Sequence, residues 1–499
     1  MAFNTPVFVV FFVVVLMLYA LMPKRYKWIW LLAASWFFYL YASAKFFIFV
    51  LLSGASAWAG TLYIQRLHDR ARQLRACDRS GEELKHMRER LKRRQKRMLI
   101  SVLVLNFGIL AVLKYFGFFC ENLNQLLESF SLEARIPGFH LILPLGISFY
   151  TFQTISYVLD VYRGQVAAQK RYYKYLMYLS SYHQLVAGPI VRYSDVAAEI
   201  ENRTVSAQDF SEGITRFCLG LTKKVVVANV AGSLAGNYLD ADLASLSVAG
   251  AWFGVLLYTL QIYYDFSAYS DMAIGLGRMF GFHYHQNFNY PYIAKSVTEF
   301  WRRWHISLGS FFRDYVYIPL GGSRKGLGRT ILNLFVVWAL TGLWHGASWN
   351  FVLWGLYFFI FIALERLFLN KVFARLPGFV SHIYLLIVVY FGWILFRFKN
   401  MALIGVVLKG MFCQNGNPWT TFEANTTLLN YIFFLAIAVI AVTPLVHNIG
   451  RAISVASGRS AAWFRVNSVV QVAMPLVLLL ISTMSLVGNS YNPFLYFQF

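Results

Sequence analysis

The sequence is dominated by long stretches without a charged residue. Between Ile331 and Leu364, 34 consecutive residues include no Asp, Glu, Lys or Arg. A helix crosses the hydrocarbon core of a bilayer with about 20 apolar residues, so this stretch predicts two segments that meet at a break near Gly342, Gly346 and Asn350. Other apolar stretches of spanning length are 6–22, 28–44, 46–64, 99–119, 141–159, 243–264, 381–396, 428–446 and 469–487. Together they predict an all-α, polytopic membrane bundle of about eleven transmembrane helices.

Charge is sparse and unequal in sign. Of the 499 residues, 13% are charged, and 45 Lys and Arg against 22 Asp and Glu give a net charge of +23. A soluble domain has about 25% charged residues, and a nucleic-acid-binding protein carries its positive charge on a polar surface. The composition argues against both classes and favours a protein embedded in the lipid bilayer, without a nucleic-acid partner.

The positive residues predict the orientation in the membrane, because Lys and Arg concentrate in cytoplasmic loops. The segment 65–98 holds 13 Lys and Arg against 5 Asp and Glu, a net of 13 − 5 = +8, and is predicted to be a cytoplasmic helical hairpin. Such a hairpin contacts anionic lipid headgroups or offers a docking site to an acidic acyl carrier protein. Counting spans outward from it places both termini outside the cytoplasm, including the uncharged tail 488–499.

His345 is the first candidate for chemistry. It lies in the middle of the uncharged stretch, in the sequence Thr341-Gly342-Leu343-Trp344-His345-Gly346. Polar groups at membrane depth are costly and are typical of functional sites. The flanking glycines permit a helix break, and non-helical backbone at this depth is tolerated where it lines a cavity. An imidazole in such a cavity is suited to general base catalysis, whereas a structural histidine is the alternative.

A second cluster runs from Glu299 to Gly322 and contains His305. If it is one helix, five residues share a face at helical spacing: Trp301, Trp304, His305, Leu308 and Phe312. Arg302, Arg303 and Arg313 lie on the other side, which predicts an amphipathic helix at the membrane interface. An interfacial anchor does not require a histidine on its aromatic face. His305 is therefore a candidate to meet His345 in a central cavity.

Two further motifs are weaker. His283-Tyr284-His285 has a spacing that metals use, but no carboxylate or cysteine lies near it in sequence, so no metal site is predicted. Gly321-Gly322-Ser323-Arg324-Lys325-Gly326 is typical of a cytoplasmic turn, and a phosphate cradle is the alternative.

Several motifs together resemble the membrane-bound O-acyltransferase (MBOAT) superfamily. The chain is most similar to the bacterial branch with the alginate O-acetylation membrane protein and, more distantly, the teichoic-acid D-alanylation membrane protein. The matching motifs are Leu143-Pro144-Leu145-Gly146-Ile147-Ser148-Phe149-Tyr150, Leu185-Val186-Ala187-Gly188-Pro189-Ile190-Val191-Arg192, Tyr264-Asp265-Phe266-Ser267-Ala268-Tyr269-Ser270-Asp271, the Trp301–Gly322 cluster and Leu343-Trp344-His345-Gly346. The family usually has Phe-Pro before Gln184, where this chain has Tyr182 and His183.

The resemblance implies acyl transfer to a hydroxyl through a central funnel. It divides the chain into N-terminal helices 1–139, a catalytic core 140–364, and C-terminal helices with an aromatic tail, 365–499. It implies His345 as the catalytic histidine and general base, with His305 orienting the acyl group or donating to the oxyanion. Tyr496, in the tail Phe494-Leu495-Tyr496-Phe497-Gln498-Phe499, matches a residue that relays the acyl group outward, and an aromatic plug is the alternative. Residues implied to contact the donor or line the funnel are Trp301, Arg302, Arg303, Trp304, Ser307, Arg313, Asp314 and Trp344.

The expected function is therefore O-acetylation of an exopolysaccharide or cell-envelope glycan at the bacterial cytoplasmic membrane. The acetyl donor is expected to be a cytoplasmic thioester, acetyl-CoA or an acyl carrier, with no other cofactor. An extracytoplasmic SGNH-type acetyltransferase is the expected partner. D-alanyl transfer to teichoic acid is the alternative within the class, although the chain's length and its own aromatic tail argue against it. A transporter or flippase, with His305 and His345 as proton-relay groups, is the alternative from another class.

Overall fold

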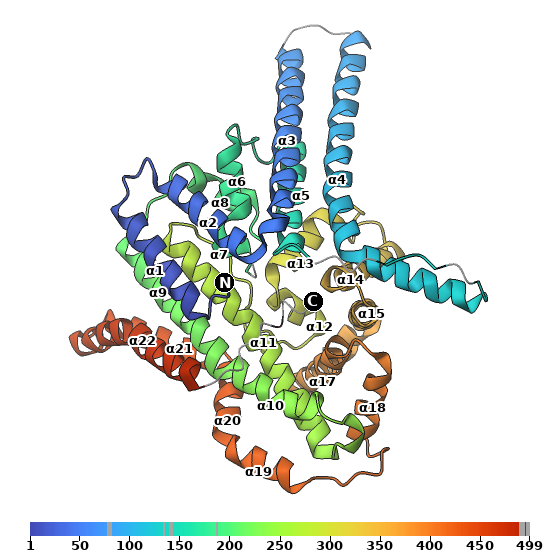
Figure 1. Ribbon diagram of the computed structural model, residues 1–499, viewed down its shortest axis with the longest axis vertical. Helices are drawn as coiled ribbons and strands as arrows, with labels where there is room; N and C mark the ends of the chain where they lie inside the picture. Colours follow the sequence, from blue (N-terminus) through green and yellow to red (C-terminus); the bar gives the residue numbers. More distant parts are fainter. Residues whose placement is uncertain (77–81, 133–134, 139–142, 186–187, 489–494, 496–499) are drawn as a thin grey trace. The chain divides into compact units, whose positions relative to one another are not determined.

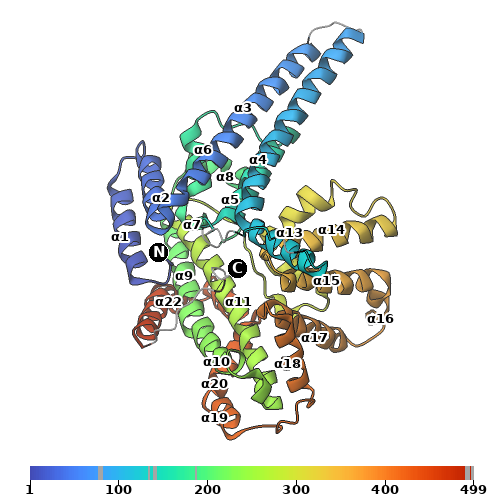
Figure 2. The same cartoon turned by 45° about the vertical axis from the view of Figure 1, so that its right-hand side comes forward.

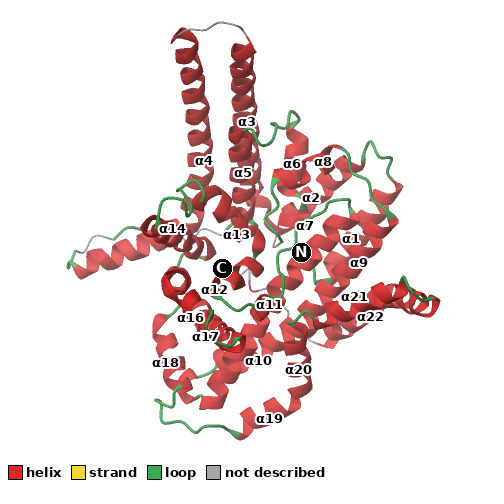
Figure 3. Cartoon of the chain, turned by 180° about the vertical axis from the view of Figure 1, so that it is seen from behind, coloured by secondary structure: helices red, strands yellow, loops and turns green. Residues whose placement is uncertain are grey.

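A computed structural model of the chain describes all residues except 77–81, 133–134, 139–142, 186–187, 489–494 and 496–499. The described residues form helices and loops, and no strand occurs among them (Figures 1 and 3). They divide into two compact units, Met1–Ser206 with Phe280–His285, and Ala207–Met279 with Gln286–Phe499. The all-α prediction is confirmed. The division into 1–139, 140–364 and 365–499 stays a prediction, because compactness does not report where catalysis occurs.

The first unit contains eight α-helices in its described part. They are α1 (Pro6–Leu21), α2 (Lys27–Ser43), α3 (Phe47–Ala76), α4 (Glu82–Ser129), α5 (Ile147–Arg163), α6 (Tyr172–Ser180), α7 (Tyr182–Leu185) and α8 (Tyr193–Glu201). Helices α3 and α4 lie side by side along much of their length (Figures 1 and 2). Most of the basic segment 65–98 forms the far ends of these two helices, so the predicted helical hairpin is confirmed.

The second unit begins with α9 (Ala207–Thr222), which continues through a π-helical turn (Lys223–Ala228) into α10 (Asn229–Leu239). Helix α11 (Val248–Met279) packs along α9 and α10. The helices that follow are α12 (Val297–Arg303), α13 (Ile306–Phe312), α14 (Leu327–His345), α15 (Trp349–Leu364), α16 (Asn370–Phe373), α17 (Gly378–Arg397), α18 (Met401–Met411), α19 (Phe422–Asn430), α20 (Ile432–Ala441), α21 (Leu445–Ser457) and α22 (Ala461–Gly488).

Within the described residues, seven helical segments are long and apolar enough to cross a membrane, and the pair α19 and α20, bent by 59°, adds an eighth. The seven are Lys27–Leu74, Glu82–Ser129, Ala207–Leu239, Leu327–His345, Trp349–Phe373, Gly378–Arg397 and Ala461–Val487. Helices α1 and α18 are shorter apolar helices. The chain is thus a multi-pass membrane protein, and the predicted number of about eleven spans is compatible with this set.

Helices α14 and α15 form the predicted break in the uncharged stretch and pack closely against each other (Figure 2). A Cβ atom at Gly342 would lie 2.4 Å from the carbonyl oxygen of Phe351, and one at Gly355 would lie 2.4 Å from that of Trp338. Any side chain at these two positions would push the helices apart. The glycines therefore let α14 end against the start of α15, and this contact fixes the position of His345.

Candidate active site

His305 occupies a break between α12 and α13. The backbone of Trp304 is extended, with φ of −100° and ψ of 129°, and His305 itself has a positive φ of 45°. The prediction of one continuous amphipathic helix is therefore wrong. The reason is Asn287, whose backbone oxygen accepts the N–H of Ile306 at 2.9 Å and whose side-chain oxygen accepts the N–H of Ser307 at 3.1 Å. These bonds satisfy donors at the new helix start and make the break favourable.

The five residues predicted to share a face are nevertheless all buried or half-buried. Trp304, His305, Leu308 and Phe312 are all buried, and Trp301 is half-buried. The indole of Trp301 contacts Trp338, Trp354 and Phe358, with ring centroids 4.9 to 5.3 Å apart. The aromatic side chains thus join the core of the second unit, and the break turns His305 into that core with them.

Asn287 also determines which nitrogen of His305 carries the proton. Its Oδ1 atom accepts from the backbone N–H of Ser307, which identifies that atom as the amide oxygen. His305 Nδ1 lies 3.2 Å from the same oxygen. Since Oδ1 is an acceptor, Nδ1 must be the donor, and in a neutral ring Nε2 then keeps its lone pair. Nε2 is buried and has no hydrogen-bond partner among the described residues.

Burial keeps this ring neutral. His305 lies between two short helices, outside the membrane-spanning segments, with 2% of its surface exposed. Removal from water lowers the pKa of His305 to about 3, because burial disfavours the charged imidazolium. At neutral pH the side chain is therefore a hydrogen-bond acceptor at Nε2, with its ring held by Asn287 and packed edge-on against Phe266.

His345 is the last residue of α14. Its ring is 9% exposed and packs edge-on against Trp354 and Phe396, with centroids 4.9 and 5.2 Å away. Gly346 follows with an extended backbone, so the chain leaves the helix directly after the histidine. The predicted helix break beside His345 is confirmed.

The two histidines converge on one side chain, Trp344. Its ring centroid lies 5.8 Å from that of His305 and 4.9 Å from that of His345. Residues 40 positions apart in sequence thus both contact one buried indole. The structure brings together the two histidines that the sequence singled out.

Of the charged residues predicted to contact the donor, Arg303, Arg313 and Asp314 form ion pairs. Arg303 forms an ion pair with Glu299 at 2.8 Å, and Arg313 pairs with Asp314 at 2.7 Å. Hydrogen bonds from the Lys295 backbone and from Arg303 lower the pKa of Glu299, although its partial burial acts in the opposite direction. Arg302 is exposed. The Ser307 hydroxyl donates a hydrogen bond to Asn287 Oδ1 at 2.9 Å, so Ser307 helps to stabilise the break between α12 and α13.

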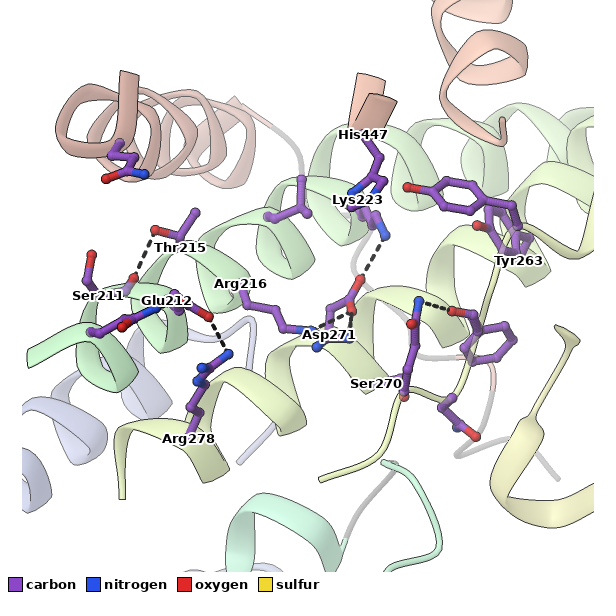
Figure 4. Close-up of a pocket in the computed structure, with 17 residues that line it drawn as sticks. Ser211, Glu212, Thr215, Arg216, Lys223, Tyr263, Ser270, Asp271, Arg278 and His447 are labelled. Carbon is purple, nitrogen blue, oxygen red and sulfur yellow. Dashed lines mark hydrogen bonds and ion pairs between the residues drawn. The ribbon is translucent and has the colours of Figure 1, made fainter. Parts of the chain in front are cut away.

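A polar cavity of about 730 Å³ reaches the same asparagine (Figure 4). Its walls come from α9, the end of α11, residues 286–290, and single residues of α21 and α22. Asp271 lies between Arg216 and Lys223, at 3.0 and 2.7 Å. Sequence reasoning missed this cavity. The only sequence signal was the pair of aspartates in the Tyr264–Asp271 motif. This motif contributed to the family resemblance, but no role was predicted for either aspartate.

The other aspartate of that motif forms a buried ion pair. Asp265 Oδ1 lies 2.6 Å from Lys224 Nζ, and both side chains are 2% exposed. Asp265 Oδ2 accepts the backbone N–H of Leu495 at 2.8 Å. This bond ties the carboxyl-terminal segment to the core of the second unit. Tyr496, the predicted relay, lies outside the described residues.

The weaker motifs have ordinary surroundings. His283 Nδ1 lies 2.7 Å from Glu199, and His285 Nε2 lies 3.8 Å from Asp195. No group of three potential metal ligands occurs among the described residues. The segment Gly321–Gly326 is a turn in which all three glycines have positive φ.

Comparison with known proteins agrees with this geometry. Residues 167–408 match the family model of MBOAT, the membrane-bound O-acyltransferase family. The chain is 37% identical to a probable alginate O-acetylase of Pseudomonas putida, with all of both chains covered. It is 33% identical to a peptidoglycan O-acetyltransferase of Helicobacter pylori, over 83% of this chain and 80% of that protein. A teichoic acid D-alanyltransferase of Bacillus subtilis is 26% identical over 52% of this chain and 69% of its own length. The chain belongs to the membrane-bound O-acyltransferase family and is an O-acyltransferase.

Proposed function

We propose that the chain transfers an acetyl group from a cytoplasmic thioester to a hydroxyl of an exopolysaccharide. The observation that carries this proposal is the meeting of two buried histidines at Trp344, one of them with a fixed, unpartnered Nε2 acceptor. Relatives named for O-acetylation of alginate and of peptidoglycan match most of the chain and support an acetyl group and a polysaccharide acceptor.

The reaction requires one proton transfer and one exchange of bonds. The acceptor hydroxyl oxygen forms an ester bond with the acetyl carbonyl carbon, while the bond from that carbon to sulfur breaks. His345 takes the hydroxyl proton as general base and then returns it to the leaving thiolate, so the net change is one proton moved from the hydroxyl to the thiol and His345 is neutral again. General base catalysis of this kind contributes about 10² to 10⁴ in rate.

The structure favours one of the two roles expected for His305. A neutral ring whose Nδ1 proton is directed at Asn287 has no proton on Nε2 to donate to an oxyanion. Nε2 instead accepts a hydrogen bond from an N–H group of the donor, which orients the acyl group that the donor carries. His305 is thus proposed as the orienting residue beside the general base His345.

The carboxyl-terminal tail is proposed as the exit route of the acetyl group. In this route the Tyr496 hydroxyl is the first acceptor and carries the acetyl group as an ester. A hydroxyl of an extracytoplasmic SGNH-type transferase then attacks the ester carbonyl, the bond to the tyrosine oxygen breaks, and the Tyr496 hydroxyl is regenerated. The support is the buried bond between Asp265 and the Leu495 amide, one peptide bond before the tyrosine. We further propose the orientation predicted from the charges, with the basic hairpin at the cytoplasmic face of the bacterial inner membrane and both termini outside.

The test is mass analysis of the envelope polymer from cells that carry the wild-type chain, His345→Ala or His86→Ala. His86 is exposed on α4 and serves as the control histidine. We expect acetyl esters on a polysaccharide with the wild type and the control, and none with His345→Ala. D-alanyl esters on teichoic acid that depend on His345 would instead establish the alternative suggested by the more distant relative.

A further inference from the structure

The first unit contains a second cavity, of about 680 Å³, that the acyl-transfer mechanism does not use. Its walls come from Tyr19 at the end of α1, residues 24–29 in the loop before α2 and its first turn, residues 171–174 at the start of α6, and residues 200–204 at the end of α8. Its volume lies in the range of small-molecule sites.

The charge in this cavity is strongly unbalanced. Six of its lining residues are basic: Lys24, Arg25, Lys27, Arg171, Lys174 and Arg203. Glu201 is the only acidic residue among those that line it, and it pairs with Lys174. Although partial burial alone raises the pKa of Glu201, its hydrogen bonds from Lys174 and Gln169 lower it below its ordinary value. Glu201 is therefore ionised, with Lys174 bonded to it and Arg171 nearby, and the wall keeps a net charge of 6 − 1 = +5.

In the cavity of the second unit, by contrast, carboxylates neutralise the clustered cations. There Arg216 and Lys223 share Asp271, and Arg278 pairs with Asp209. In the first unit, two of the cations contact an uncharged aromatic residue instead: Arg203 Nε donates to the Tyr19 hydroxyl at 3.2 Å, and Lys27 Nζ lies 4.7 Å from the Tyr19 ring centre. These contacts position the cations without neutralising them. An anion is the missing partner.

Two features narrow the class of anion. Arginine presents a planar fork of N–H donors that matches phosphate oxygens, and three of the six cations in the wall are arginines. One wall also carries a stacked aromatic pair, Trp28 and Tyr173, with ring centroids 4.3 Å apart and planes inclined by 21°. Such rings can support a planar base. Five positive charges exceed what a single phosphate or carboxylate would balance.

We propose that this cavity binds a ligand with two or more phosphate groups, of nucleoside diphosphate size. Two kinds of ligand present such phosphate groups at a membrane: the nucleotide end of a coenzyme A thioester, and the headgroup of an anionic lipid with two phosphates. The site itself is independent of acyl transfer. Only its assignment to the thioester rests on the proposed function.

The first arm of the test uses adenosine 3′,5′-bisphosphate as the probe. The full-length protein is placed in nanodiscs of neutral phosphatidylcholine, and binding is measured by calorimetry. The cavity variant carries Lys24→Gln, Arg25→Gln and Arg171→Gln, and the control carries Arg90→Gln, Lys92→Gln and Arg94→Gln on α4. All six positions are exposed, so both variants should fold, and both lose three positive charges. A charge-assisted contact is worth about tenfold in affinity. We expect the cavity variant to bind at least about a hundredfold more weakly, and the control to bind as the wild type does.

The second arm uses nanodiscs that contain cardiolipin, followed by native mass spectrometry. If the ligand is the lipid, cardiolipin remains on the wild type and on the control but not on the cavity variant, and the nucleotide probe binds weakly to all three. Either pattern supports a phosphate site. Equal binding of both probes to the wild type, the cavity variant and the control would overturn it. Because no turnover is measured, His345→Ala should retain binding even if acyl transfer proves to be the wrong function.

Discussion

Removing Lys224 should be among the most damaging single changes in the second unit. The variant Lys224→Met keeps the length of the side chain but leaves the Asp265 carboxylate 2% exposed and without its cation. Breaking a buried ion pair in this way typically costs about 3 to 5 kcal/mol, because an uncompensated charge stays in a medium of low polarity. The Leu495 amide, which donates to the other carboxylate oxygen, cannot supply the lost positive charge.

Lys223 offers a matched control one residue earlier in the same π-helical turn. Its partner Asp271 is also bound by Arg216 at 3.0 Å, and the Lys223 side chain is 24% exposed. Lys223→Met should therefore cost about 1 kcal/mol or less. The assay is denaturant-induced unfolding of the purified protein in detergent, with Lys224→Met, Lys223→Met and the double variant Lys224→Met/Asp265→Leu. We expect the double variant to recover much of the lost stability, since no charge remains buried. Equal stability of the two single variants would refute the reasoning.

Three further predictions concern the active site. Asn287→Ala removes the acceptor that holds the His305 tautomer, so kcat should fall by at least about tenfold. Asn287→Asp keeps an acceptor for both His305 Nδ1 and the Ser307 N–H, so it should restore much of kcat, and denaturant-induced unfolding of both variants separates a loss of kcat from a loss of stability. The folded-state pKa of His305, about 3, lies below its unfolded value near 6.5, so its contribution to stability is full above pH 6.5. That contribution is lost by about 1.4 kcal/mol per pH unit as the pH falls toward 3, and His305→Gln should flatten this limb in unfolding measured against pH. Tyr496→Phe should abolish polymer acetylation if the hydroxyl is a relay, and unchanged acetylation would identify the tail as a plug.

Features that depend on the solvent around a segment could be predicted from the sequence. The uncharged stretch 331–364 predicted two helices with a break, and the basic segment 65–98 predicted a helical hairpin, because apolar length and charge report locally whether lipid or water surrounds the chain. His345 followed from the same reasoning, since a polar side chain at membrane depth is costly and the glycines beside it permit a break.

Features that depend on residues far away in the sequence could not be predicted from it. The break at His305 requires Asn287, 18 residues earlier, to satisfy the start of α13, and helical spacing alone predicts a continuous helix there. The bond from Asp265 to Leu495 spans 230 residues. The basic cavity of the first unit gathers residues from four segments, some of them far apart in the sequence, and no single segment has a pattern typical of a binding site.

The most direct test of the central claim is thioester consumption by purified protein in liposomes supplied with acetyl-CoA labelled in its acetyl group. The account predicts a labelled acetyl ester on the protein tail or on an added polysaccharide, with a rate that falls by about 10² to 10⁴ in His345→Ala while the protein remains folded in the membrane. Near-normal acylation by His345→Ala, or movement of an intact substrate without thioester consumption, would contradict it.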